Sequence, residues 1–342
     1  MEAAFLQAFK GENKTVPVWF MRQAGRYLPE YQALKKKHAL QEMFCQPELA
    51  AEVTCQPVDI LGVDAAILFA DILTLPSAMG FEIHFDSRKG PVIQLMNNWR
   101  QAHDFEGLDY VAGTIRLARQ RLPASVPLIG FAGAPFTVLT YLIEGGSSLT
   151  YARTFRFLQE QPEAFDGLMR LLTKNTVAYL RLQRQAGIQA VQIFDSWAGI
   201  LPAVIFARRV LPFVREIFDA LEGLPSIYFC RGSAHLWPYL IQSGADVLSV
   251  DHTVALDAPW IRGMRQGLQG NLFNGLLYAD HATLSAAVHQ TLEAARWQPR
   301  YIFNLSHGVM PDMDVEKLKA VVRQVHAYPW KEKKREDLAL HK

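Results

Sequence analysis

Short apolar runs alternate with longer stretches of helical periodicity along most of the chain. Two of these runs, "AAILFA" and "AVQIF", are almost continuously apolar, which is typical of parallel strands that are buried on both faces. Strands that alternate with helices predict βαβ units and a parallel sheet. The pattern therefore predicts an α/β fold, a single (β/α)8 TIM-type barrel over residues 1–342. The predicted strands are 16–21, 65–70, 127–131, 190–194, 226–229, 246–250, 267–270 and 301–304.

Three segments depart from this rhythm. The first residues, "MEAAFLQAFKGENK", predict a short amphipathic N-terminal helix. Residues 80–95 alternate apolar and polar side chains around "SRKG", which predicts a β-hairpin inserted after the second strand and bordering the barrel mouth. Residues 330–342, "WKEKKREDLALHK", are highly charged and predict a solvated or frayed C-terminal tail.

Composition excludes several classes of partner. The 342 residues are half hydrophobic and one-fifth charged, and the formal net charge is only +2, so no basic face for nucleic acid is expected. No apolar run reaches the roughly 18 residues that a membrane span needs, and the N-terminus lacks the pattern of a signal peptide. Three sparse cysteines suit a reducing compartment. We expect a soluble, cytoplasmic protein without nucleic-acid or membrane partners.

The stretch "FMRQAGRYLPEY" carries the first candidate chemistry. Arg22 and Arg26 lie four residues apart after an apolar run, and Glu30 is the first acidic residue that follows them. Gly25 and Pro29 argue against a regular helix here. Two arginines on such a loop predict a receptor for anions that the protein itself does not supply.

The end of the second predicted strand carries a carboxylate. Asp71, in "LFADIL", is flanked by apolar residues, and an unpaired buried carboxylate costs several kcal/mol. Either Arg22 or Arg26 pairs with Asp71, or its hydrogen-bond donors arrive with a substrate. The other polar residues that follow predicted strands are Asp195, Ser196, Cys230, Arg231, Asp251, His252, Asn271, Ser306 and His307.

Other chemistries lack their residues. No lysine follows a predicted strand, so Schiff-base catalysis is not expected. Dinucleotide-binding, Walker, zinc-protease and nucleophile-elbow motifs are absent, so we expect neither a cofactor nor a metal.

Several of these stretches together resemble the uroporphyrinogen decarboxylase family. They are "PVWFMRQAGRYLPEY", "FADILTLPSAMG", "GFAGAPFTVLTYLIEGGSS", "QIFDSWAG", "VLSVDHTVALDAP", "QGNL" and "NLSHGVMPDM", and they cover nearly the whole chain in order. The resemblance implies a cofactor-free barrel, a homodimer, and removal of four acetate carboxyl groups from uroporphyrinogen III to give coproporphyrinogen III in heme biosynthesis.

The resemblance also implies roles for individual residues. Catalytic roles fall to Asp71, Arg22 and His307. Substrate binding falls to a larger set that comprises Arg22, Gln23, Ala24, Gly25, Arg26, Asp71, Tyr141, Ser196 and His307. The identity of the proton donor stays open between an arginine, His307 and Tyr141. Ser306 and Phe273 depart from the family pattern and put the shape of their loops in question.

Alternative interpretations remain at this point. A zinc- or cobalamin-linked methyltransferase of the same superfamily would need a His-x-Cys pair and a later cysteine, but Tyr228 stands at the histidine position and no cysteine follows Cys230. A non-catalytic tetrapyrrole carrier would use the same arginines. Ser196 has an N-cap role as its structural alternative. Asp195, Asp251 and His252 are expected to be structural, and Cys230 to be a small buried hydrophobe.

Overall fold

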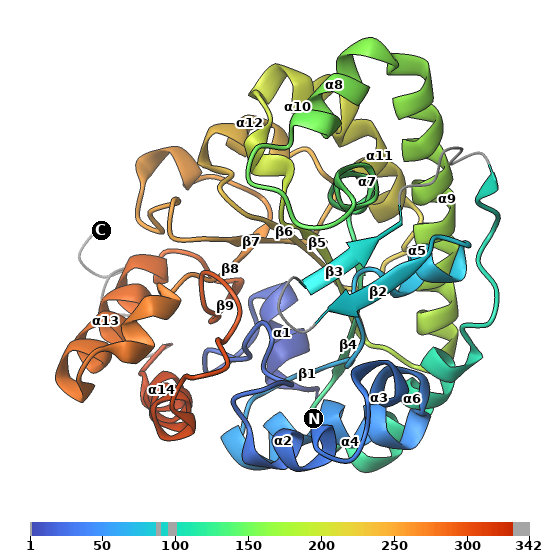
Figure 1. Cartoon of the computed structure of the whole chain (residues 1–342). Coiled ribbons are helices and arrows are strands. Elements are labelled where there is room, and N and C mark those ends of the chain that lie inside the picture. Colours follow the sequence, from blue (N-terminus) through green and yellow to red (C-terminus); the bar gives the residue numbers. More distant parts are fainter. Residues whose placement is uncertain (1, 87–89, 95–100, 331–342) are drawn as a thin grey trace.

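A computed structural model of the chain describes residues 2–86, 90–94 and 101–330 (Figure 1). Its centre is a curled parallel sheet surrounded by helices. In spatial order, the strands of this sheet are β1 (Ala66–Ile67), β4 (Leu128–Gly133), β5 (Ala190–Asp195), β6 (Ser226–Cys230), β7 (Val247–Val250), β8 (Gly267–Gln269) and β9 (Tyr301–Ile302). The predicted α/β barrel class is confirmed, with the predicted strands in sequential order around the sheet.

The first predicted strand, 16–21, is wrong as a regular strand, although it lies in the expected place. Val18 forms one isolated parallel bridge to Phe303, and the Phe303 N–H donates to the Pro17 carbonyl over 2.9 Å. On the other side, the Val18 N–H donates to the Asp64 carboxylate over 2.7 Å, and the Asp64 N–H donates to the Val18 carbonyl. The Asp64 side chain here replaces one backbone hydrogen bond of the sheet, and Pro17 has no N–H to donate. This segment therefore joins β9 to β1 and closes the ring.

The helices pack around the outside of this ring. Their apolar faces follow helical spacing, as in α9, where Phe165, Leu168, Leu172 and Tyr179 are all buried. The α-helices are α1 (Ala4–Lys10), α2 (Pro29–Lys35), α3 (Leu40–Cys45), α4 (Pro47–Leu61), α5 (Thr74–Ala78), α6 (Asp109–Arg121), α7 (Pro135–Glu144), α8 (Ala152–Glu160), α9 (Pro162–Ala186), α10 (Ala203–Arg209), α11 (Leu211–Asp219), α12 (Trp237–Leu240), α13 (His281–Ala295) and α14 (Val315–Ala327). Short 3₁₀ helices are η2 (Ala198–Ile200), η3 (Ala234–Leu236), η4 (Pro259–Ile261) and η5 (Asn274–Tyr278).

The inserted hairpin is present where it was predicted. Its strands β2 (Ile83–Asp86) and β3 (Gly90–Ile93) pair antiparallel outside the main sheet. β3 is fixed to the end of α7, because the Ile93 N–H donates to the Gly145 carbonyl over 3.0 Å. The hairpin thus joins the loops at the C-terminal ends of the barrel strands (Figure 1).

The two ends of the chain also bear on the predictions. The predicted N-terminal helix is α1. The charged tail was predicted to begin at Trp330, which is wrong for that residue: Trp330 is buried and stacks on Tyr301, with ring centroids 5.6 Å apart. The rest of that prediction, 331–342, lies outside the described residues.

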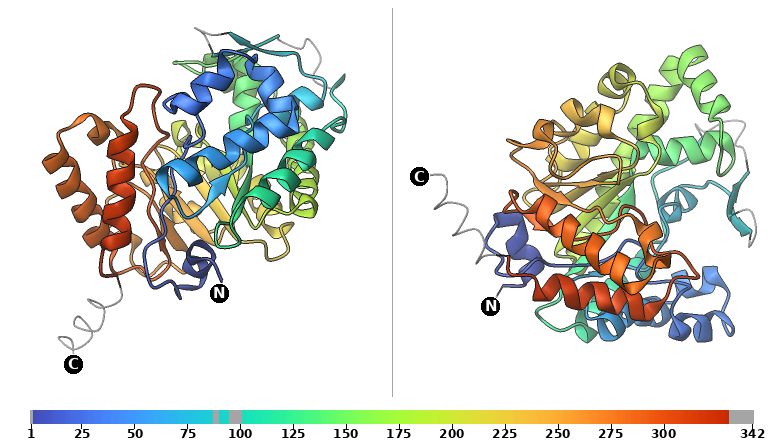
Figure 2. Two further views of the ribbon diagram at one scale, coloured as in Figure 1. Left: turned by 90° about the horizontal axis from the view of Figure 1, so that it is seen from below. Right: turned by 90° about the vertical axis from the view of Figure 1, so that its left-hand side faces the viewer.

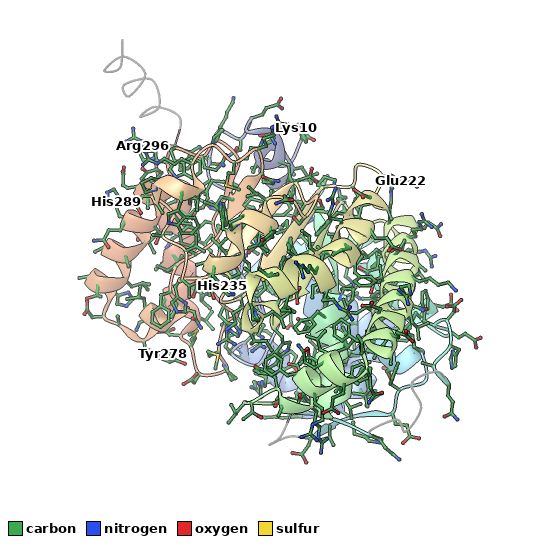
Figure 3. All side chains as sticks on the ribbon, turned by 90° about the horizontal axis from the view of Figure 1, so that it is seen from above. Lys10, Glu222, His235, Tyr278, His289 and Arg296 are labelled. Carbon is green, nitrogen blue, oxygen red and sulfur yellow. The ribbon has the colours of Figure 1, made fainter. Side chains whose placement is uncertain are left out.

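The barrel has two distinct ends. α13 and α14 lie side by side on its outer wall (Figure 2). Figure 3 shows Lys10, Glu222 and Arg296 toward one end and Tyr278, which follows β8, toward the other. Among the described residues, no helix combines the length and apolarity required for a membrane crossing.

Candidate active site

A cavity of about 320 Å³ opens at the C-terminal ends of the strands, where barrel enzymes place their chemistry. Its size lies at the lower end of the range for small-molecule sites, roughly 300–1,000 Å³. The polar groups on its wall are contributed by Arg22, Asp71, Tyr141, Ser196 and His307. Five residues that are far apart in the sequence, and that were all predicted as site residues, are therefore brought together around one space.

Asp71 is the carboxylate of this cavity. It lies between β1 and α5, and its Oδ1 accepts a hydrogen bond from the Leu73 N–H over 2.8 Å. Its Oδ2 has no partner among the described residues, and the ion pairs described for the chain do not include Asp71. Burial raises the pKa of Asp71, and the Leu73 N–H and the Arg22 charge offset this only in part. Of the two alternatives drawn from the sequence, pairing with an arginine of the loop is therefore not what the structure shows.

Arg22 stands beside Asp71 with its charge unpaired among the described residues. Its backbone has a φ of 60°, a left-handed conformation that costs a non-glycine residue roughly 1–3 kcal/mol. Its side chain is solvent-accessible inside the cavity, yet protein surrounds it closely enough that desolvation lowers its pKa, while Tyr141 and Asp71 act in the opposite direction. Arg22 also lies against Gly308, where a Cβ atom would come within 2.6 Å of the Arg22 Cγ.

The rest of the loop 22–26 divides into supporting and open positions. The Gln23 side chain is fully buried: its Oε1 accepts from the Phe20 N–H over 3.0 Å, and its Nε2 donates to the Ala65 carbonyl over 2.9 Å. Gln23 thus fixes the loop to the sheet and is not among the residues that line the cavity. Ala24 does line it, and the N–H groups of Ala24 and Gly25 have no hydrogen-bond partner among the described residues.

Arg26 lies outside the cavity wall. It is exposed and has no ion-pair partner among the described residues, but its charge is near enough to lower the pKa of Arg22. The loop therefore presents two uncompensated cations, one inside the cavity and one outside its wall.

Tyr141 and Ser196 occupy neighbouring parts of the wall. Tyr141 extends from α7, and its ring meets the Trp197 ring edge to face at a centroid distance of 5.4 Å. Burial raises the pKa of the Tyr141 hydroxyl, and the nearby Asp71 carboxylate adds to this effect. Ser196 does not cap a helix, because η2 begins at Ala198 after Trp197. Its hydroxyl has no partner among the described residues and is available to a ligand.

His307 follows β9 and is half-buried. Desolvation lowers the pKa of His307 to about 4, and the positive charges of Arg22 and Arg231 contribute to this shift. In the free protein the imidazole is therefore neutral near pH 7. An imidazolium acid would need anions bound to those arginines.

The wall also has an aromatic part that was not predicted from the sequence. Phe131, Phe194 and Phe229 come from three adjacent strands, and their rings pack edge to face at centroid distances of 5.6 and 5.9 Å. In the sequence these residues cannot be told from core residues, because they lie within apolar strands. Together they form an apolar wall that suits the flat face of an aromatic or pyrrolic ring.

The residues expected to be structural are bound within the protein. Asp195 is fully buried, and its carboxylate accepts from the Thr137 hydroxyl over 2.6 Å and the Tyr228 hydroxyl over 2.7 Å. Cys230 is also fully buried, and burial raises the pKa of its thiol well above the usual range. Among the described residues, no group of three or more His, Cys, Asp or Glu side chains is arranged to hold a metal ion.

Comparison with known proteins identifies the family of this chain. The family model described as "Uroporphyrinogen decarboxylase (URO-D)" matches residues 2–328. The uroporphyrinogen decarboxylase of Thermodesulfovibrio yellowstonii is 45% identical over 341 residues, covering 97% of this chain and 100% of that protein. The uroporphyrinogen decarboxylase of Geobacillus thermodenitrificans is 43% identical over 337 residues, covering 95% of this chain and 96% of that protein.

Solved structures give the fold alone. A methyltransferase from Methanosarcina mazei superposes with a TM-score of 0.78 at 19% identity, covering 94% of this chain and 97% of the other. At this identity the likeness carries no argument about the reaction. The family model and the full-length relatives carry that argument, and they place this chain in the uroporphyrinogen decarboxylase family.

Proposed function

We propose that the protein removes the acetate carboxyl groups of uroporphyrinogen III as CO2 and leaves methyl groups, giving coproporphyrinogen III. Membership of the family supports the reaction. The observation that carries the proposal for this chain is Asp71: a carboxylate with one oxygen that has no partner among the described residues, held in a cavity that also presents Arg22 and a wall of phenylalanine rings.

The proposed binding mode pairs each free group of the cavity with a group of the substrate. Uroporphyrinogen has eight carboxylates at its rim and four pyrrole N–H groups at its centre. Arg22 binds a carboxylate, and the free N–H groups of Ala24 and Gly25 add donors at the same loop. The Asp71 carboxylate accepts from the pyrrole N–H groups, which supply donors for the oxygen that has no partner among the described residues. Each charge-assisted hydrogen bond contributes about 1.5–3 kcal/mol.

The proposed mechanism uses the pyrrole ring as its own electron acceptor. A proton adds to the ring carbon that bears the acetate arm, and the ring becomes a cation. The bond between the arm and its carboxylate then breaks, its electron pair neutralises the cation, and CO2 leaves. A second proton reaches the exocyclic carbon as the ring proton departs, so each cycle consumes one proton and yields one methyl group. The fixed Asp71 anion stabilises the cation as it develops.

The first proton can come from several groups of the wall. Desolvation lowers the pKa of Arg22, and its guanidinium lies beside Asp71. His307 is neutral in the free protein, but bound carboxylates would offset the arginine charges that lower its pKa. A pH–rate profile of His307→Asn and Arg22→Lys separates these donors. A general acid must be protonated to act, so a fall in rate at high pH that does not change in the histidine variant removes His307 from this role.

We also propose a homodimer located in the cytoplasm. Trp260, within η4, and Phe273 and Tyr278, at the two ends of η5, are aromatic side chains that are about half exposed. Exposed apolar side chains are a feature of protein contact surfaces. The cysteines Cys45, Cys55 and Cys230 are all free thiols, which suits a reducing compartment. Light scattering coupled to size-exclusion chromatography tests the dimer, and a monomer at micromolar concentration contradicts it.

The deciding experiment is an anaerobic incubation with uroporphyrinogen III, followed by oxidation and separation of porphyrins by carboxylate number. We expect loss of one to four carboxylates with wild type and a fall of about 10²–10³ in kcat for Asp71→Asn. The exposed Asp219 provides the matched control, because Asp219→Asn makes the same change away from the cavity. Near-normal kcat in Asp71→Asn contradicts the role of Asp71.

The same experiment separates the alternatives. Tight binding without CO2 release indicates a tetrapyrrole carrier. Absence of binding indicates that the arginines of the loop serve another anion, and methyl transfer then has to be assayed.

A further inference from the structure

Arg231 is a third arginine at the barrel mouth, outside the set assigned to the site so far. It follows β6 directly, so it lies at the same end of the barrel as Arg22. In the ring order, the segment around Val18 is followed by β1, β4, β5 and β6, and β6 is therefore the fifth of eight positions. Arg22 follows the first position. The two arginines consequently start from opposite sides of the barrel mouth.

The backbone at Arg231 is rigidly held. Its N–H donates to the Asp195 carbonyl over 3.3 Å, and the next N–H, of Gly232, donates to the Asp251 carboxylate over 2.6 Å. The Gly199 backbone packs against the same turn: a Cβ atom there would lie 2.7 Å from the Gly232 carbonyl oxygen and nearer still to that of Arg231. The long side chain therefore extends from a fixed base.

The charge of Arg231 is not neutralised by the protein. Its side chain is exposed and has no hydrogen-bond or ion-pair partner among the described residues. The nearby acids are already occupied, because Asp251 accepts from Gly232 and Thr253, and Asp195 accepts from Thr137 and Tyr228.

The charge of Arg231 is nevertheless close to the site. It lowers the pKa of both Arg22 and His307, so the guanidinium lies within electrostatic range of the cavity wall. It also lies near Tyr151, whose ring packs on Trp197 at a centroid distance of 4.8 Å. A cation left unpaired at this position is available for an anionic group that extends out of the cavity.

We propose that Arg231 binds a peripheral carboxylate of the tetrapyrrole on the side of the macrocycle opposite to Arg22. The inference rests on the proposed function. A macrocycle with carboxylates around its whole rim can be held from both sides only if cations stand on both sides of the mouth. Arg231 then sets the orientation of the ring over Asp71, and it contributes to the selection of substrates with many carboxylates.

The test compares Arg231→Gln and Arg231→Lys with Arg181→Gln. Arg181 is an exposed arginine on α9, away from the cavity wall, so its substitution removes the same charge without touching the site. We expect Arg231→Gln to raise KM about 10-fold with little change in kcat, and Arg231→Lys to restore part of the affinity. The slope of log kcat/KM against log ionic strength should become shallower for Arg231→Gln.

Several results would overturn the inference. Equal KM values for Arg231→Gln and Arg181→Gln show that Arg231 does not contact the substrate. A fall in kcat at unchanged KM, or failure of lysine to restore affinity, indicates a structural role instead. Wild-type CO2 release decides the proposed function separately. The Kd for uroporphyrinogen, followed by tryptophan fluorescence because Trp197 borders Tyr141, tests Arg231 even without turnover.

A last arm of the experiment identifies the carboxylate. Coproporphyrinogen keeps only the propionate arms. If Arg231 holds a propionate, Arg231→Gln weakens product inhibition as much as it raises KM. If it holds an acetate, the inhibition constant of the product stays at the Arg181→Gln value while KM rises.

Discussion

Gly308→Ala tests whether the position of Arg22 controls the reaction. A Cβ atom at Gly308 would lie 2.6 Å from the Arg22 Cγ and 3.0 Å from its Cβ, and the Cδ would be closer still. An ordinary contact begins near 3.4 Å, so the Arg22 side chain has to move by close to 1 Å. A displacement of this size in a positioning group costs about 10²-fold in rate. We therefore expect kcat/KM to fall about 100-fold.

Stability should change much less than activity. The Arg22 side chain is solvent-accessible and can move into the cavity, so the overpacking cost of about 1–3 kcal/mol that applies to a sealed core is an upper limit. Thermal unfolding followed by circular dichroism measures the change in stability. Steady-state decarboxylation at several substrate concentrations measures the change in kcat/KM. Gly113→Ala, in α6 and away from the cavity, controls for the general effect of adding a methyl group.

A double-mutant cycle tests whether Gly308→Ala acts through Arg22. If the methyl group acts through Arg22, Gly308→Ala should have almost no further effect in an Arg22→Gln background, because the misplaced group is already gone. Additive losses would show that Gly308→Ala disturbs something else. Wild-type kcat/KM in the single variant would show that Arg22 tolerates displacement and that its position is not critical.

Three further predictions concern protonation. The His307 imidazole should stay neutral until the pH falls to about 4. Arg22→Gln or Arg231→Gln should each raise the pKa of His307, because each removes a nearby cation. Histidine NMR measures this pKa, and His307→Gln identifies its resonance. Burial raises the pKa of Asp195 to about 6, so wild type should lose roughly 3 kcal/mol of stability as pH rises from about 4 to 6. Urea unfolding of Asp195→Asn should not show this loss. Equal pH dependence of the unfolding free energy in wild type and variant would contradict the prediction. The hydrogen bond to Asp64 raises the pKa of His326, so this interaction should stabilise the fold fully below pH 6.5 and lose its effect as pH rises through the raised pKa. His326→Gln should therefore reduce the free energy of unfolding most at low pH. A stability difference between wild type and variant that grows with pH would contradict this.

The sequence predicted the architecture well where strands pair by backbone alone. It was wrong at 16–21 because the closing seam depends on the Asp64 side chain, which the Val18 N–H and His326 both contact, 2.7 Å away in each case. Side chains that substitute for a ladder hydrogen bond leave no periodic signal. Trp330 was assigned to the tail because charged residues follow it, although its ring completes the packing around Tyr301.

In the candidate site, too, the local sequence does not show which polar groups find partners in the fold. Asp71 and Asp195 both come at the end of a predicted apolar strand, and both are carboxylates whose pKa is raised by burial. Nothing in their immediate sequence says which one is free. The difference comes from Thr137 and Tyr228, hydroxyls from distant segments that satisfy both oxygens of Asp195, whereas within the described part of the chain the Asp71 carboxylate receives only the Leu73 N–H.

Whether a polar group has hydrogen-bond or ion-pair partners within the protein, more than its residue type, therefore distinguishes the groups that hold the barrel together from those available to a substrate. Gln23 lies within the loop 22–26, yet its amide is fully occupied by Phe20 and Ala65. Arg22 and Arg231 have no such partners among the residues that the structure describes, although an arginine is costly to leave unpaired near other cations. Arg22 and Arg231 repel each other, and one oxygen of Asp71 has no donor among the described residues. Under the proposed function, a ligand with a negative rim and a hydrogen-bond-donating centre satisfies both. The proposed substrate, a tetrapyrrole that carries carboxylates on every side, is complementary to this arrangement of charges.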